Sequence, residues 1–122
     1  MGEFRETFET YGGDYRETLD RFLGDESLYL RILDMLFQDK NLDALRASLQ
    51  SGDLAAAFEA AHTLKGVTGN LGLAPLYEAV CHVVEPLRAG EQRGDYGALC
   101  RAVEEEFERA RELRDRLKGG RE

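Results

Sequence analysis

The chain has 122 residues, the length of one domain, and carries a formal net charge of −8. A hydrophobic fraction of 43% beside a charged fraction of 33% is typical of a globular protein and argues against a disordered one. The acidity argues against nucleic-acid binding, which needs lysine and arginine to neutralise phosphates. No apolar run approaches the roughly 18 residues that cross a bilayer, and the acidic start lacks the features of a signal peptide. We therefore expect a cytoplasmic protein, not associated with membranes, whose partners are proteins or small molecules.

Apolar residues recur at helical spacing along the chain, and no stretch alternates apolar and polar residues as a strand does. A first short helix is predicted over residues 15–23. Asp25 then provides an N-cap for a second helix, whose apolar stripe runs from Leu28 to Phe37. A further short helix is predicted over residues 41–49. These three segments account for the first half of the chain.

Three longer helices are predicted in the second half. The first covers residues 54–70, and the second begins near Leu73, with Pro75 tolerated in its first turn. Pro86 should kink or fray the end of that second helix. The last helix is predicted over residues 95–117. Long amphipathic helices with short connections indicate an all-α fold, an antiparallel four-helix bundle with short additional N-terminal helices.

The domain organisation follows from this pattern. Residues 1–13 are expected to be an N-terminal extension, residues 14–117 the bundle, and residues 118–122 a charged tail. Cys81 and Cys100 are the only cysteines, and two widely separated thiols form no metal-ligand pattern. We expect both to be reduced and to serve in packing.

The most informative pattern of the chain begins at His62. Lys65 and Gly66 follow three and four residues later, so all three share one face of a helix. Gly69 and Gly72 come within the next two turns, although each glycine inside a helix costs about 1 kcal/mol relative to alanine. This arrangement indicates a surface that is kept bare so that another molecule can approach the histidine.

A helical wheel predicts which way His62 points. With His62 at 0°, Leu64 lies at about 200° and Val67 at about 140°, on the side expected to face the core. Lys65 lies within about 60° of His62 on the opposite side. The residues expected to surround His62 and to contact a partner are Phe58, Glu59, Gly66, Gly69, Asn70 and Leu73.

This arrangement suits one kind of chemistry. A neutral imidazole is a nucleophile near pH 7, and an adjacent lysine disfavours the imidazolium and can screen negative charge on a phosphoryl group. Glu59, one turn before His62, would be placed to accept a hydrogen bond from Nδ1 and to leave Nε2 as the attacking nitrogen. A solvated surface glutamate is the alternative for Glu59, as a solvated surface histidine is for His62.

The run His62-x-Leu64-Lys65-Gly66, with Gly72 further along, resembles the signature of histidine-containing phosphotransfer (HPt) domains. The further positions that resemble the family are the segment 22–29, Leu76, Glu85, Leu87, Arg88 and Gly90.

The resemblance covers about residues 14–115 and implies a phosphorelay intermediate. His62 would accept the phosphoryl group at Nε2, Lys65 would stabilise its charge, Gly66 would give the partner room, and Leu64 would anchor this turn in the core. The implied partners are response-regulator receiver domains, including the receiver of a hybrid histidine kinase, which donate and accept the phosphoryl group through an aspartate.

The resemblance also bears on cofactors and assembly. This chain would bind no metal or other cofactor itself, with Mg²⁺ supplied by the receiver, and it would act as a monomer. No ATP-binding signature is present, so self-phosphorylation is not expected. A stand-alone HPt protein and a domain excised from a larger sensor kinase would have the same pattern, so both remain open.

Two other functions remain open. Glu59-x-x-His62 matches one half of a di-metal carboxylate bundle, but the second pair, Glu78 and His82, has a different spacing, and both pairs are predicted to face solvent. The other alternative is a scaffold that binds receivers without carrying phosphate. Loss of the histidine would be the usual mark of such a scaffold, and here His62 is present.

Overall fold

The structure is a computed structural model that describes residues 2–119. These residues form helices and no strand, which confirms the all-α prediction. The helices are α1 (Glu3–Tyr11), α2 (Tyr15–Asp20), α3 (Glu26–Gln38), α4 (Asn41–Ser51), α5 (Leu54–Asn70), α6 (Ala74–Arg88) and α7 (Tyr96–Gly119).

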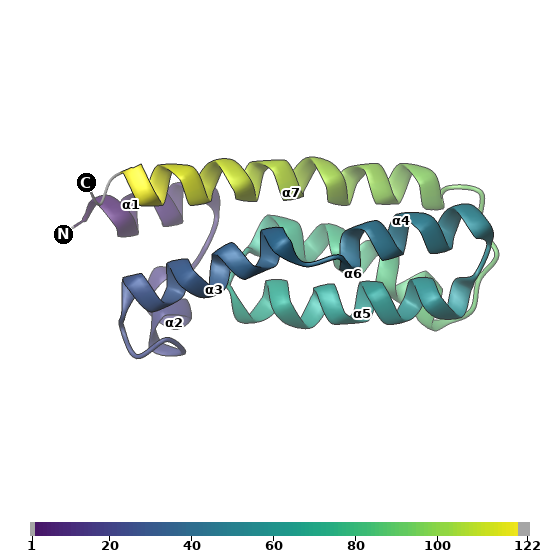
Figure 1. Ribbon diagram of the computed structural model, residues 1–122, viewed down its shortest axis with the longest axis horizontal. Helices are drawn as coiled ribbons and strands as arrows, with labels where there is room; N and C mark the ends of the chain where they lie inside the picture. Colours follow the sequence, from purple (N-terminus) through teal and green to yellow (C-terminus); the bar gives the residue numbers. More distant parts are fainter. Residues whose placement is uncertain (1, 120–122) are drawn as a thin grey trace.

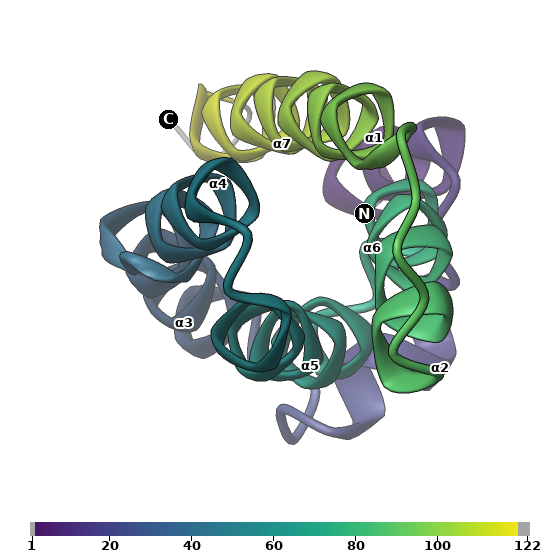
Figure 2. The ribbon, with the colours of Figure 1, turned by 90° about the vertical axis from the view of Figure 1, so that its right-hand side faces the viewer.

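The helices are packed as four rods around one hydrophobic core (Figures 1 and 2). The helices α3 and α4 follow one another along one rod, and α5, α6 and α7 each form one of the others. The rod of α3 and α4 is interrupted at Asp39, whose backbone is extended and whose carboxylate accepts a hydrogen bond of 2.6 Å from the amide of Asn41. Consecutive rods run in opposite directions (Figure 1), as the prediction of an antiparallel four-helix bundle requires.

The first helix of the structure was not predicted. The segment expected to be an extension contains α1, whose Phe4 and Phe8 are buried and whose axis lies beside the end of α7 (Figure 1). Both rings meet the buried ring of Tyr29 edge to face, with centroids 6.2 and 5.7 Å apart. Two apolar residues one turn apart are too few for a periodic signal, so only the packing reveals this helix.

Other boundaries differ by a few residues. The helix predicted to reach residue 23 ends at Asp20, and a tight turn follows it. Pro75 lies in the first turn of α6, as predicted, and Pro86 lies inside the same helix, which continues to Arg88. At that position the proline removes one backbone donor in the last turn of a helix and does not end it.

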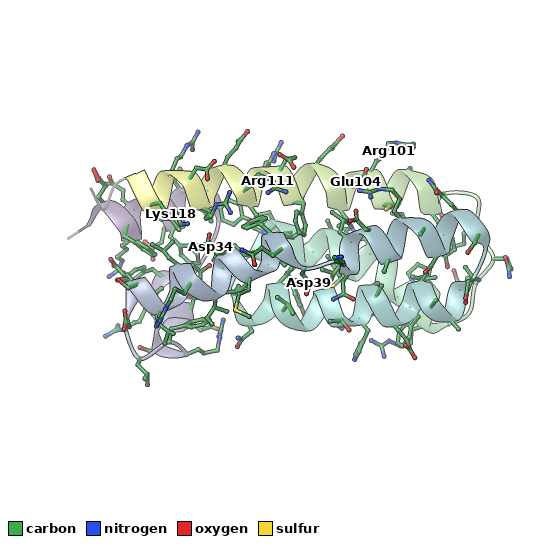
Figure 3. All side chains as sticks on the ribbon, viewed as in Figure 1. Asp34, Asp39, Arg101, Glu104, Arg111 and Lys118 are labelled. Atoms are coloured by element: carbon green, nitrogen blue, oxygen red, sulfur yellow. The ribbon has the colours of Figure 1, made fainter. Side chains whose placement is uncertain are left out.

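Polar side chains hold the rod of α3 and α4 against α7. Lys118 donates a hydrogen bond of 2.7 Å to Asp34, and the two residues face each other between α7 and α3 (Figure 3). The Phe37 ring lies under the guanidinium groups of Arg111 and Arg114, at 4.9 and 4.8 Å from its centroid. This seam therefore combines ion pairing with cation–π contacts.

Both cysteines are free thiols, and Cys100 is buried while Cys81 is half-buried. Burial raises the pKa of the Cys100 thiol above its usual range, which keeps it protonated. A role in packing is consistent with this environment. None of the helices in the described part of the chain is long and apolar enough to span a membrane.

Candidate functional site

Helix α5 presents His62 to the outside, as the helical wheel predicted. Its N-terminus is capped by Asp53, whose carboxylate accepts a hydrogen bond from the amide of Ala56. The inner side of the helix consists of small and apolar residues, and the side chain of His62 is exposed on the opposite side. The buried residues of α5 are Ala57, Ala60, Ala61, Leu64 and Thr68.

The imidazole of His62 is stacked on an aromatic ring one turn earlier. The ring centroids of His62 and Phe58 are 5.4 Å apart, with an angle of 22° between the planes. The guanidinium of Arg88 also lies over the Phe58 ring, 5.4 Å from its centroid. Phe58 therefore lies at this surface, where its ring stacks on the imidazole and restricts the orientation of His62.

Lys65 is held from the neighbouring helix. Its Nζ lies 3.6 Å from the carboxylate of Glu85 on α6, and the same carboxylate pairs with Arg88 at 3.6 Å. The lysine side chain is 26% exposed, so its charge is partly shielded from water and is directed by this pairing. A cation is thus fixed one turn from the imidazole of His62.

An open groove of about 480 Å³ runs along this face of α5. It brings together His62, Lys65 and Gly66, as the spacing predicted. It also includes two residues that no spacing in the sequence predicts, Arg21 from the turn after α2 and Tyr77 from α6. The residues that line the groove are Arg21, His62, Lys65, Gly66, Gly69, Asn70 and Tyr77.

The three glycines of the motif have different structural roles. A Cβ at Gly66 would meet nothing within 4 Å, so this glycine leaves open space in the groove. A Cβ at Gly69 would lie 3.1 Å from the ring of Tyr77, so this glycine allows α6 to pack closely. Gly72 has a φ of +67°, and a Cβ there would overlap Thr18. Of these three glycines, Gly66 is the one whose missing side chain is not required by packing within the described residues.

One residue predicted on this face, Leu73, is not found there, and the hydrogen bond suggested for Glu59 is not formed. Leu73 is fully buried. The helical wheel does not apply to this residue, because α5 ends at Asn70 and Leu73 lies beyond the turn, directly before α6. Glu59 is exposed, and within residues 2–119 it makes no hydrogen bond with His62, whose ring stacks on Phe58. Asn70 is exposed and lines the groove, in the position predicted for it.

The pairs considered for a metal site lie on the surface. Glu59 and His62 on α5 are exposed, as are Glu78 and His82 on α6. In the part of the chain that the structure describes, no three His, Cys, Asp or Glu side chains gather in a way that could hold a metal ion. The inward projection that a di-metal carboxylate bundle requires is therefore not found for either pair.

Arg21 fastens the turn after α2 to the end of α5. Its Nε donates to the carbonyl of Asn70 at 3.1 Å, and its second terminal nitrogen donates to the carbonyl of Gly69 at 3.2 Å. A cation at these carbonyls also interacts favourably with the negative end of the helix dipole. No sequence pattern pointed to this contact, because it joins residues 48 and 49 positions apart.

Replacing Arg21 with alanine is expected to lower the free energy of unfolding by about 1 kcal/mol, since the two exposed hydrogen bonds and the dipole interaction are lost. Urea unfolding followed by circular dichroism measures the change. Arg16→Ala, on the exposed surface of α2, is the matched control and should lie within about 0.5 kcal/mol of wild type. Equal stabilities for both variants would show that the Arg21 contacts contribute nothing measurable.

Comparison with known proteins identifies the family. A model of the Hpt domain matches residues 3–119, nearly the whole chain. No curated protein and no solved structure matches the chain. Hpt domains are histidine phosphotransfer intermediates of phosphorelays and interact with receiver domains. The chain therefore belongs to the Hpt domain family and is a histidine phosphotransfer intermediate.

Proposed function

We propose that His62 carries the phosphoryl group and that a response-regulator receiver docks on the face of α5 around it. The observation that carries this proposal is the groove in which the exposed imidazole, the cation of Lys65 and the open space at Gly66 lie together. A nucleophile that reacts with an aspartyl phosphate buried in another protein's active site needs all three features.

In the transfer step, the lone pair of His62 Nε2 attacks the phosphorus of the receiver's aspartyl phosphate. A P–N bond forms, the P–O bond to the aspartate breaks, and the aspartate leaves as a carboxylate. Nδ1 retains its proton during the attack. Transfer to a second receiver reverses these changes, with a carboxylate oxygen as nucleophile and the neutral imidazole as leaving group.

Lys65 would stabilise negative charge on the phosphoryl oxygens during this step. Its pairing with Glu85 fixes the ammonium beside the groove, so little reorganisation is needed when the phosphoryl group arrives. The Mg²⁺ that such a transfer uses would be supplied by the receiver, and the phosphoryl group would come from an aspartate and not from ATP.

His82 is the other histidine of the chain and is also exposed. It lies on α6 and is not among the residues that line the groove. We therefore assign the acceptor to His62 and use His82 as the internal control.

The proposal also includes the setting in which the protein acts. We expect it to act in the cytoplasm as a monomer, because a net charge of −8 disfavours self-association. Its partners would be response-regulator receivers and the receiver of a hybrid histidine kinase.

The test is a transfer reaction from receiver domains of the source organism, each labelled with ³²P. Wild type and His82→Gln should acquire acid-labile label from at least one receiver, and His62→Gln should acquire none. Label on His62→Gln would show that the acceptor is wrong. Binding of a receiver without any labelling of wild type would favour the scaffold instead.

A further inference from the structure

Leu23 occupies an unusual position in the turn between α2 and α3. Its side chain is 88% exposed, whereas the other large apolar side chains of the described chain, apart from Met35, are buried or partly buried. Its φ of +59° makes it the one non-glycine residue between 2 and 119 with a positive φ. A left-handed residue commonly ends a helix, but glycine is the usual residue there and a leucine is unfavourable.

The exposure of Leu23 does not arise from a loose turn. The amide of Gly24 donates to the carbonyl of Leu19 at 2.8 Å, and the amide of Asp25 donates to the carbonyl of Phe22 at 2.9 Å. The side chain of Phe22 is buried and meets the Tyr29 ring edge to face. The backbone is therefore fixed on both sides of Leu23, and the turn holds an apolar side chain in water.

The same turn contributes one residue, Arg21, to the groove that contains His62. Arg21 lines that groove and donates hydrogen bonds to the carbonyls of Gly69 and Asn70. Figure 2 shows the segment between α2 and α3 passing the end of α5 and projecting beyond its outer side, and Figure 1 places it at the same end. A protein that covers the groove and reaches His62 would meet this turn.

We infer that Leu23 is an apolar anchor that enters a depression on the receiver domain when the receiver docks over His62. This inference rests on the proposed function, because it assumes that the receiver approaches the groove. Burial of an exposed leucine strengthens binding, and a residue already fixed by its backbone loses little freedom when it binds. The left-handed backbone at Leu23 belongs to the C-terminal cap of this helical turn, in which the amide of Leu23 also donates to the carbonyl of Asp20 at 3.3 Å. The exposure of the leucine side chain, by contrast, has an explanation in recognition and none in the packing of the chain.

The decisive variant is Leu23→Asn, because asparagine tolerates the left-handed region and removes the apolar side chain. Transfer from the receiver that labels wild type fastest is measured as kcat/KM and as the rate at saturating receiver. We expect kcat/KM to fall about tenfold or more, with the saturating rate within about twofold of wild type. The thermal unfolding temperature should stay the same or rise, since the strain is relieved.

Met35→Gln is the matched control, because Met35 is 61% exposed on α3 and lines none of the grooves described. It should transfer at the wild-type rate. A similar loss of kcat/KM in Met35→Gln would overturn the inference, since any loss of exposed apolar surface would then suffice. An unchanged kcat/KM in Leu23→Asn would overturn it directly.

Phosphorylation with phosphoramidate, which needs no partner protein, separates this inference from the proposed function. Wild type and Leu23→Asn should be phosphorylated on His62 at equal rates. Absence of phosphate on His62 in both would refute the proposed function, whatever the role of Leu23. If light scattering showed that wild type is a dimer and Leu23→Asn a monomer, Leu23 would serve contact with a second copy, and the inference would be wrong.

Discussion

Replacing Gly66 with tryptophan is expected to reduce phosphoryl transfer from a receiver at least a hundredfold while the protein stays folded. The position is helical, and a Cβ there meets nothing within 4 Å, so the indole would enter the groove and not the core. There it would prevent the receiver's aspartyl phosphate from coming within bonding distance of His62. Misplacement of reacting groups by about 1 Å already costs on the order of 100-fold in rate.

Gly66→Ala is the matched control for this prediction. The methyl group is small and has open space, and alanine in a helix is favoured over glycine by about 1 kcal/mol. The variant should be more stable than wild type by about that amount and should still transfer. Stopped-flow or quench-flow transfer assays measure the rates. A Gly66→Trp variant that is folded and transfers as wild type does would show that the receiver does not approach along this groove.

The second large effect is expected at Gly72, where alanine should lower the free energy of unfolding by about 2 to 4 kcal/mol. Two causes combine here. The φ of +67° is unfavourable for any residue with a Cβ, and the added carbon would overlap the hydroxyl of Thr18 in the buried contact between α2 and the end of α5. Denaturant unfolding of Gly72→Ala against wild type measures the loss.

A double variant separates the two parts of this loss in stability, the part due to the backbone conformation and the part due to the overlap with Thr18. Thr18→Ala removes the hydroxyl and the methyl group that the new carbon would meet, so Thr18→Ala with Gly72→Ala should recover the steric part and retain the backbone part. The same glycine-to-alanine change therefore has opposite signs at positions 66 and 72. Equal stability of Gly72→Ala and wild type would contradict the structural role assigned to Gly72.

The helical wheel was reliable where the helix is regular. Between Asp53 and Asn70 the helix is uninterrupted, and His62, Leu64 and Lys65 lie on the sides that the wheel gave them. It was wrong at Leu73, three residues past the end of the helix, where the chain has already turned. Periodicity holds only within one element, so a surface assembled across a turn cannot be derived from it.

The rest of the groove depends on tertiary contacts. Arg21 reaches it from a turn more than 40 residues earlier in the chain, and Tyr77 reaches it from the next helix, where Gly69 leaves room for its ring. Neither residue belongs to the motif around His62, so spacing gave no reason to select them. The strain at Leu23 is likewise a property of the folded backbone and has no signal in sequence.

Locating the phosphate after transfer from a labelled receiver decides whether His62 carries the phosphoryl group. Trypsin cleaves after Lys65 and therefore separates the two histidines, with His62 in the peptide 47–65 and His82 in the peptide 66–88. Digestion at alkaline pH preserves phosphohistidine, and tandem mass spectrometry then identifies the modified peptide. We expect phosphate on the peptide 47–65 at His62, whereas phosphate confined to the peptide 66–88 would show that His62 is not the acceptor.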